Sequence, residues 1–305
     1  MILIADSGST KTDWSLLHAP RPLKWELVSS FKTQGITPVH QTTDQIRRIL
    51  GHELLPQLST FSRATLSKRV LETPLLSQIE VFFYGSGCTP AHVPAMKRML
   101  AEVFPTEKIE VHSDLMAAAR GLCQREEGIA CILGTGANSC LYDGQAIVQN
   151  TPALGYILGD EGSGSVLGRM FMNAIFKNPQ FAAVRDDYLS KSKLMQADII
   201  NKVYREPMAN RFLASTSLYI YEHLDNALLS GLVVENFRQF FRSNITPYRR
   251  PDLAVSFVGS MASNYQRQLE EAAAAEGYAL GKVLQSPMEG LLQYHTNGKF
   301  IQDSQ

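Results

Sequence analysis

The N-terminal stretch MILIADSGSTKTDWSLL (residues 1–17) places a loop of small and hydroxyl residues between two apolar runs. Residues 2–5 are typical of a buried strand, and Trp14, Leu16 and Leu17 indicate a second strand. Glycine and serine in the loop let backbone N–H groups approach an anion, and serine, threonine and lysine side chains add further donors. On this stretch alone, a phosphate-binding loop and an ordinary hairpin turn are equally good interpretations.

The composition is that of an ordinary globular protein. Of the 305 residues 45% are hydrophobic and 19% charged, and 29 basic residues balance 29 acidic ones. A balanced charge gives no overall field that would draw the chain onto nucleic acid or an anionic membrane. We find no apolar run long enough to span a membrane and no signal-peptide pattern. Four cysteines without a C-x-x-C pair favour reduced thiols, so we expect a cytoplasmic protein.

The first part of the chain predicts a meander followed by alternating strands and helices. A third strand over 24–34 completes the expected antiparallel meander. Helical spacing follows at 42–55 and, more weakly, at 62–72. The remaining predicted elements are a strand at 79–87, a helix at 89–104 with Pro90 in its first turn, a strand at 108–114 and a helix directly after it.

The strand pattern of the N-terminal residues is then repeated. GIACILGTGANSCLYDGQAIVQN (128–150) again gives strand, small-residue loop, strand, turn and strand. The chain is mostly helical from about 165 to 245, and a strand within 252–264 and a helix at 265–276 follow. The repeated plan predicts two duplicated halves with a boundary near residue 115.

Three known phosphate-binding signatures do not explain the two loops, at 6–12 and 134–139. The Walker motif G-x-x-x-x-G-K-[ST] and the protein-kinase motifs are absent from the sequence. The GTGANS segment is followed by a predicted strand, whereas a dinucleotide-binding fingerprint must open a helix. Two matching loops in duplicated halves favour a polyphosphate site over two plain hairpins.

Asp114 ends a predicted strand and precedes a predicted helix. A carboxylate at this end of a strand lies where open α/β sheets bind ligands. The other interpretation is a helix N-cap, a role that Asp114 or Ser113 would fill. LGYILGDEGSGSVLG (154–168) is the other acidic candidate, because its glycines allow close approach of a ligand and Asp160–Glu161 suit sugar hydroxyls or hydrated magnesium.

Five motifs occur in a characteristic order, and through them the sequence resembles a known family. They are DSGSTKTDW, SDLMAA, ILGTGANS, LGDEGSGS and FVGSMASN. The order is similar to that of the N-acetylglucosamine kinase branch of the actin/Hsp70/sugar-kinase superfamily, also called the BadF/BadG/BcrA/BcrD ATPase-like family. The resemblance implies an α/β fold of duplicated actin-like ATPase (ribonuclease H-like) domains with a nucleotide and sugar cleft between them. The domains expected are 1–114, completed by a helix within 285–305, and 115–284, with the helical insertion at about 165–245.

The resemblance also implies roles for individual residues. Asp114 would be the catalytic base acting on the sugar hydroxyl, and Asp6 would also hold the metal. The nucleotide and phosphate ligands implied are Asp6, Gly8, Ser9, Thr10, Lys11, Gly134, Thr135, Gly136, Gly259 and Ser260. The substrate-binding residues implied are Thr37, Asp114, Asn138 and Asp160, with Thr135 and Gly136 also near sugar and phosphate.

The sequence departs from the family at two positions beside the implied sugar pocket. Relatives that phosphorylate N-acetylglucosamine usually have asparagine after the third strand, where QGITP (34–38) has Thr37. Leu154 stands where tryptophan is common. The segment SPMEGLLQY (286–294) also differs from the family. These departures affect the choice of sugar rather than the ATP machinery.

The activity implied is an ATP- and Mg²⁺-dependent kinase that phosphorylates a hydroxyl of an amino sugar or related hexose. One alternative is a BadF-type ATPase that couples ATP hydrolysis to another protein, although such relatives hold an iron–sulfur cluster through paired cysteines. A sugar-sensing regulator is the other, although related regulators usually begin with a helix-turn-helix. We expect a small-molecule sugar as partner and neither nucleic acid nor membrane, and leave a homodimer open.

Overall fold

The computed structural model describes residues 1–21, 24–59 and 75–301. The chain forms two compact units. Unit 1 combines Met1–Gln124 with Pro287–Gln305, and unit 2 is the continuous segment Arg125–Ser286. Among the described residues, no helix has the length and apolar character needed to cross a membrane.

Unit 1 contains a mixed sheet with the strand order β11-β3-β2-β1-β4-β5 among its described residues. β1 pairs antiparallel with β2, and β2 with β3, so the predicted meander is confirmed. β4 and β5 continue the sheet in parallel with β1. The strands are β1 (Ile2–Ser7), β2 (Lys11–Arg21), β3 (Lys24–Gln34), β4 (Glu80–Gly85), β5 (Ile109–Ser113) and β11 (Phe300–Ile301).

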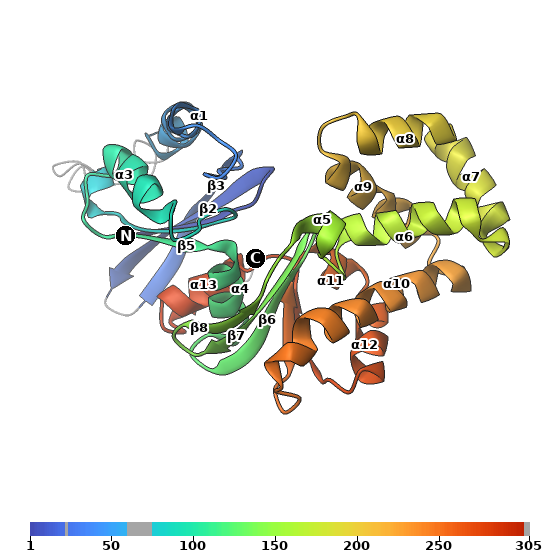
Figure 1. The fold of residues 1–305 in the computed structure, drawn as a ribbon. Helices are drawn as coiled ribbons and strands as arrows, with labels where there is room; N and C mark the ends of the chain where they lie inside the picture. The colour runs from blue at the N-terminus through green and yellow to red at the C-terminus, as the bar shows by residue number, and fades with distance from the viewer. Residues whose placement is uncertain (22–23, 60–74, 302–305) are drawn as a thin grey trace. The chain divides into compact units, whose positions relative to one another are not determined.

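Both faces of this sheet are covered, which explains why the first strand is apolar throughout. Leu3 and Ala5 of β1 belong to a core with α1 (Thr43–Arg48), the π-helical turn Ile49–Leu54 and α3 (Val93–Val103). The alternate residues Ile2 and Ile4 pack on the opposite face with α4 (Asp114–Cys123) and α13 (Met288–His295). Figure 1 shows α1 and α3 on one side of the sheet and α4 and α13 on the other. Strand alternation places successive side chains on opposite faces.

Helix α4 belongs to unit 1, so the first division falls between Gln124 and Arg125 rather than after residue 114, and the second falls after Ser286 rather than after residue 284. The Gln124 side-chain amide donates to the Gly290 carbonyl at 3.0 Å, which ties the end of α4 to α13. Gly121 and Gly290 allow this approach, because a Cβ on Gly121 would lie 2.9 Å from the Pro287 carbonyl oxygen. The C-terminal helix is therefore an integral part of unit 1.

Unit 2 repeats the strand plan of unit 1. Its sheet has the order β10-β9-β6-β7-β8 among the described residues, with β6, β7 and β8 antiparallel and β9 and β10 parallel to β6. The strands are β6 (Glu127–Leu133), β7 (Ala137–Asp143), β8 (Ile147–Thr151), β9 (Val255–Val258) and β10 (Leu280–Leu284). The predicted fold class, a duplicated α/β fold, is confirmed.

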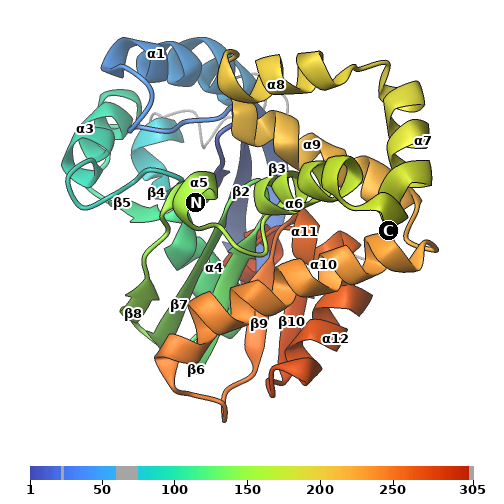
Figure 2. The same ribbon diagram turned by 45° about the vertical axis from the view of Figure 1, so that its right-hand side comes forward.

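A series of helices separates the third and fourth strands of unit 2. They are α5 (Gly155–Leu158), α6 (Gly164–Lys177), α7 (Ala182–Ser192), α8 (Gln196–Tyr204), α9 (Ala209–Glu222) and α10 (Ala227–Phe240), with 3-10 turns at Pro179–Phe181 and Thr246–Tyr248 and a π-helical turn at Phe241–Ile245. After β9 come α11 (Ser260–Asn264) and α12 (Gln266–Ala275). Figure 2 shows α6 and α9 side by side, and α10 beside α12.

Some local predictions need correction. The helix predicted over 89–104 begins at Val93 with Pro94 in its first turn, because residues 89–92 form a turn closed by the Thr89 carbonyl and the His92 N–H at 2.8 Å. The helix expected at 42–55 is present, but it is α-helical to Arg48, π-helical over Ile49–Leu54 and α-helical again over 55–59. The helix expected at 62–72 lies outside the described residues. β10 and α5 are elements that the sequence pattern did not predict.

Candidate functional site

The first candidate loop, residues 6–12, joins β1 and β2 and is fixed by hydroxyl groups. Ser7 is buried, and its Oγ lies 2.6 Å from Thr12 Oγ1 and accepts from the Ile36 N–H at 2.9 Å. Thr12 in turn donates to the Gln34 carbonyl at 3.1 Å. Two side chains of the loop thereby hold it against the end of β3.

Gly35 allows this contact, and sequence reasoning missed it. A Cβ at this position would collide with the Gly8 carbonyl oxygen and lie 2.7 Å from Ser9 C and 2.8 Å from Thr10 N. The Gly35 N–H donates to the Thr10 carbonyl at 3.1 Å. Only a residue without a side chain fits beneath the loop. Its position directly after a predicted strand was the available signal.

The tip of the loop is exposed and carries both signs of charge. Gly8, Ser9, Thr10 and Lys11 are exposed, and Lys11 Nζ lies 2.6 Å from Asp13 Oδ2. Asp13, which sequence reasoning did not select, is the pairing partner of Asp6 across β1 and β2. Directly opposed residues of antiparallel strands share a face of the sheet.

This arrangement fits a magnesium ion that accompanies a phosphate ligand. Mg²⁺ is usually held by one or two carboxylates together with phosphate oxygens and water. Asp6 and Asp13 supply the carboxylates on one face. The described residues contain no group of three or more His, Cys, Asp or Glu side chains that would form a metal cage of protein ligands alone.

Asp114 is the first residue of α4 but is not its N-cap. Ser113 is the cap, and its Oγ accepts from the Met116 N–H at 3.3 Å. The Asp114 carboxylate accepts instead from the Leu115 N–H at 2.9 Å and from the Ser86 hydroxyl. Burial raises the pKa of Asp114 above its ordinary value, and these hydrogen bonds only partly oppose the shift. The capping role that competed with catalysis is therefore filled by Ser113.

Ser86 connects Asp114 to the first loop. Its N–H donates to the Ser7 carbonyl at 2.9 Å, while its hydroxyl reaches Asp114. Ser7, Ser86 and Asp114 stand at or just after the carboxyl ends of three adjacent parallel strands, β1, β4 and β5. Ligands of α/β sheets bind at such ends. Sequence reasoning placed Ser86 near the end of the strand predicted at 79–87 but assigned it no role.

Thr37 lies in the same unit and has an unusual environment. Its side chain is only 5% exposed, and its Oγ1 has no hydrogen-bond partner among the described residues. The methyl group packs against Gly87, where an added Cβ would lie 3.1 Å away. Buried polar atoms in native proteins are almost always paired. This hydroxyl is therefore the kind of group that a ligand completes.

The second loop, Gly134–Ala137, is fixed by a segment distant in sequence. The Gly134 carbonyl accepts from the Gly164 N–H at 2.8 Å. The Thr135 carbonyl accepts from the Ser165 hydroxyl at 2.7 Å and from its N–H at 3.2 Å. β7 follows the loop as a strand, which confirms that GTGANS does not open a helix.

Asp160 stands directly beside this loop. A Cβ on Gly136 would lie 3.0 Å from Asp160 Oδ2, and the carboxylate accepts from the Ala137 N–H. Burial raises the pKa of Asp160, and the neighbouring Glu161 adds to the rise. The backbone of Asp160 is left-handed, with φ of 57°. A non-glycine residue in this conformation is uncommon and is often found at functional sites.

Asn236 holds the acidic loop in place and was missed by sequence reasoning. It is fully buried in α10, accepts from the Gly162 N–H at 3.1 Å and donates to the Ser163 carbonyl at 3.2 Å. Ser163 then caps α6. A lone asparagine in a long helical region gives no signal of its own in the sequence.

The remaining predicted residues of unit 2 lie at the ends of its strands. Gly259 follows β9 with φ of 119°, and an added Cβ would collide with the Leu133 carbonyl oxygen at the end of β6. Ser260 is exposed at the start of α11. The Asn138 side-chain oxygen is already used, because it accepts from the Ser139 N–H and from Asn150 Nδ2, each at 2.9 Å. Leu154 precedes α5 and is 59% exposed.

Each unit thus gathers its own predicted residues at the carboxyl ends of its parallel strands. Unit 1 holds the first loop, Thr37 and Asp114, while unit 2 holds the second loop, Asp160 and Gly259. Exposed loop amides and hydroxyls suit phosphate groups, and a carboxylate with a raised pKa suits proton transfer.

Comparison with known proteins supports this interpretation. No protein-family model and no curated protein matches the chain. Among solved structures, the "Putative N-acetylglucosamine Kinase" from Porphyromonas gingivalis is 45% identical, with 97% of this chain and 99% of that chain covered and a TM-score of 0.86. A structure of the same name from Chromobacterium violaceum is 18% identical over 95% and 96% of the chains, with a TM-score of 0.65. A ROK hexokinase from Thermus thermophilus is 14% identical over 93% and 92%, with a TM-score of 0.52.

The fold and these likenesses define the class as an actin-like ATPase fold of the sugar-kinase type. Within that class, the 45% identity over nearly the whole chain shows the family. The chain belongs to the N-acetylglucosamine kinase-like family of the actin/Hsp70/sugar-kinase superfamily.

Proposed function

We propose that this protein is an ATP-dependent kinase that transfers the γ-phosphoryl group to a hydroxyl of an amino sugar, such as N-acetylglucosamine, or of a related hexose. The observation that carries the proposal is the link from the first loop through Ser86 to Asp114. The phosphate-type loop follows β1 and the carboxylate of raised pKa follows β5, and Ser86 joins them from the end of β4, the strand between. The relative from P. gingivalis supports the same activity by its name.

Phosphoryl transfer needs positioning and charge stabilisation more than covalent help from the protein. In the proposed site, the amides and hydroxyls of Gly8–Lys11 and Gly134–Gly136 bind the phosphates, and Lys11 offsets their negative charge. Asp6 and Asp13 would hold magnesium, which neutralises charge that develops on the phosphate oxygens. Gly259 and Ser260 contact the nucleotide in the same proposal.

Asp114 takes the proton of the acceptor hydroxyl while that oxygen attacks the γ-phosphorus and the bond to ADP breaks. A raised pKa brings the carboxylate closer to the working pH and makes it a stronger base. The Ser86 hydroxyl orients the carboxylate. Thr37 Oγ1, which is buried and has no hydrogen-bond partner among the described residues, hydrogen-bonds the acceptor, and Asp160 binds a further hydroxyl of the sugar.

A coupled ADP-release assay across hexoses, hexosamines, N-acetylhexosamines and muramic derivatives tests this function. We expect ADP release that depends on one class of sugar and on magnesium, with a sugar phosphate detected by mass spectrometry. ADP release that is independent of every sugar would favour the ATPase alternative. Absence of nucleotide binding in calorimetry at millimolar ATP would overturn both.

A further inference from the structure

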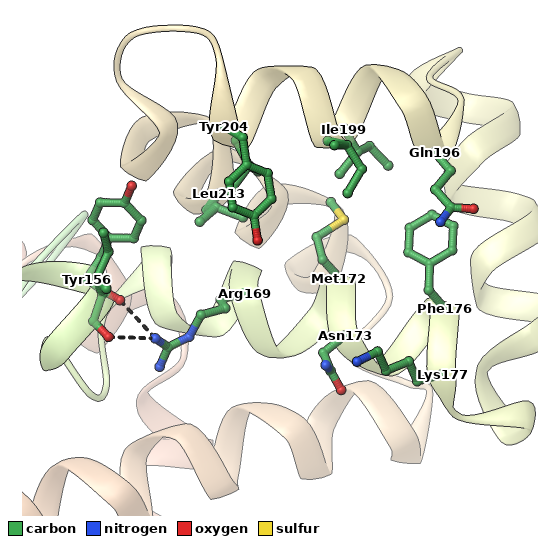
Figure 3. A pocket seen from close by; sticks show the side chains of 13 residues that line it. Tyr156, Arg169, Met172, Asn173, Phe176, Lys177, Gln196, Ile199, Tyr204 and Leu213 are labelled. Atoms are coloured by element: carbon green, nitrogen blue, oxygen red, sulfur yellow. Dashed lines mark hydrogen bonds between the residues drawn. The ribbon is translucent and has the colours of Figure 1, made fainter.

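Unit 2 contains a cavity that the proposed reaction does not use. It has a volume of about 630 Å³ and lies among α5, α6, α8 and α9. Figure 3 shows Met172 and Phe176 of α6 facing Ile199 and Tyr204 of α8 across it. Pockets that bind small molecules typically measure about 300–1,000 Å³ and combine an apolar lining with a few polar groups.

The apolar part of the lining is unusually exposed for large side chains. Tyr204 is 77% exposed, Ile157 68% and Ile200 50%, and all three border the cavity. Their apolar surface would leave water if a ligand occupied the site. Contiguous exposed apolar surface around a hollow is a common sign of a binding site.

All charged side chains that line the cavity are positively charged. Arg169 and Lys177 line the cavity, and no Asp or Glu is among the lining residues. The whole sequence has equal numbers of basic and acidic residues, so this asymmetry is local. Lys177 Nζ has no hydrogen bond or ion pair within the described part of the chain.

Arg169 is already oriented by the protein. Its Nη1 donates to the carbonyl oxygens of Tyr156 and Ile157 at 3.1 and 3.2 Å, near the carboxyl end of α5, as Figure 3 shows. A guanidinium group has five donors, so Nε and Nη2 stay available to an anion. Asn173 and Gln196 add uncharged hydrogen-bonding groups to the lining.

We propose that this cavity binds a small amphipathic anion, with an aliphatic or aromatic body against Met172, Phe176 and Tyr204 and its anionic group at Arg169 and Lys177. The cavity lining contains no residue of the two phosphate loops and does not contain Asp114, so its occupancy can be tested without kinase activity. Binding is therefore measured on the full chain without sugar or nucleotide.

The probe is 8-anilinonaphthalene-1-sulfonate, an aromatic anion whose fluorescence rises in an apolar site. We expect saturable binding with one site per chain. Ile200→Trp fills the mouth of the cavity and should weaken binding about tenfold or more, since each 1.4 kcal/mol corresponds to a factor of ten. The matched control Leu218→Trp replaces an exposed side chain of α9 that does not line the cavity and should leave binding unchanged.

The charge requirement is tested separately. Lys177→Gln should lower the affinity for the probe by about two- to fivefold, the range for one exposed ion pair. Lys97→Gln on α3 is the matched control and should leave the affinity unchanged. Octanoate should displace the probe at concentrations at which octanol does not. Melting curves check that each variant is folded.

Equal probe binding by Ile200→Trp and Leu218→Trp would place the probe elsewhere and overturn the site. Equal displacement by octanoate and octanol would overturn the anionic class of the ligand.

Discussion

The two units build nearly the same strand plan but stabilise their loops by different means. In unit 1 the loop is held against the end of β3, the third strand of its own meander, through the hydroxyls of Ser7 and Thr12 and the missing side chain of Gly35. In unit 2 the loop is held from outside, by Gly164 and Ser165 at the start of α6. A duplicated scaffold therefore keeps the position of a loop while changing which residues fix it.

The units also differ in the residue that follows the fifth strand. In unit 1 this strand, β5, leads directly into Asp114, whereas in unit 2 β10 is followed by Gln285 and Ser286. Only one half of the duplication carries an acid at this position. If the proposed reaction is correct, its proton acceptor comes from unit 1 alone, and the following experiments test that asymmetry.

The largest effect is expected for Asp114→Asn. This change keeps the shape of the side chain and leaves the cap at Ser113, but it removes the proton acceptor. General-base catalysis contributes about 10²–10⁴-fold, so kcat should fall by that factor while nucleotide binding stays unchanged. Steady-state kinetics and calorimetry measure the two quantities. A fully active variant would remove Asp114 from the mechanism.

The raised pKa of Asp114 gives the same variant a pH signature. Because the folded pKa lies above the unfolded value near 3.8, the protonated form favours folding, and this contribution is lost as the pH rises through the folded pKa. Relative to the wild type, the asparagine variant should gain stability as the pH rises above about 4, until the pH exceeds the folded pKa of Asp114. Denaturant unfolding at several pH values measures the difference, and a constant difference would contradict it.

The next effect distinguishes Gly35, which lies beneath the first loop, from Gly134 in the second loop. Gly35→Ala should lower the free energy of unfolding by about 3 kcal/mol, because the new Cβ collides with the backbone of the first loop. Gly134→Ala is the matched control, since nothing lies within 4 Å of its added Cβ. It should change stability by less than about 1 kcal/mol. Equal losses in urea unfolding would mean that the loops are packed alike.

A smaller, local effect is expected for Asn236→Leu. Loss of the amide leaves the Gly162 N–H and the Ser163 carbonyl buried without this partner, at a cost of about 2 kcal/mol. Amide hydrogen exchange should become faster at the Gly164 N–H, which supports the second loop. It should stay unchanged at the Gly35 N–H, which supports the first loop. Ser7→Ala should produce the reverse pattern. Faster exchange at both positions in either variant would show that the loops are not fixed independently.

The smallest effect concerns Thr37. Thr37→Val removes a buried hydroxyl that has no partner in the described part of the chain, so stability should stay equal or rise by about 1 kcal/mol. Nucleotide binding should not change, while the KM for the sugar should rise because the acceptor loses its hydrogen bond. An unchanged KM would show that Thr37 does not contact the acceptor.

Most of the strands, though not β10 or β11, and both loops could be predicted because their signals are local. The apolar run of β1 reflects burial on both faces, and the repeated strand–loop–strand pattern identified the duplication. Asp114 was found in the same way, at the end of a strand. Whether it caps the helix could not be decided from sequence, because Ser113 and Asp114 are equally suitable caps and only the coordinates separate them.

The residues that were missed act through contacts across the fold. Gly35 matters because another segment crosses it, Ser86 because it joins two strand ends, and Asn236 because it pairs with a loop far away in sequence. No hydrophobic periodicity or motif spacing in the sequence predicts these contacts. The start of α3 at Val93 was misplaced for a related reason, since two prolines offered alternative first turns and the turn at 89–92 decided between them.

The discontinuity of unit 1 has a consequence for the order in which the protein folds during synthesis. Unit 2 is continuous, so its whole sequence has been made once Ser286 is added. Unit 1 must wait for α13, because Leu291 and Leu292 complete the core that contains Ile2 and Ile4. Until then one face of the first sheet lacks the part of its cover that α13 supplies. We therefore expect the nascent chain to complete its second unit before its first, and to bind chaperones through the exposed face of the N-terminal sheet in the interval.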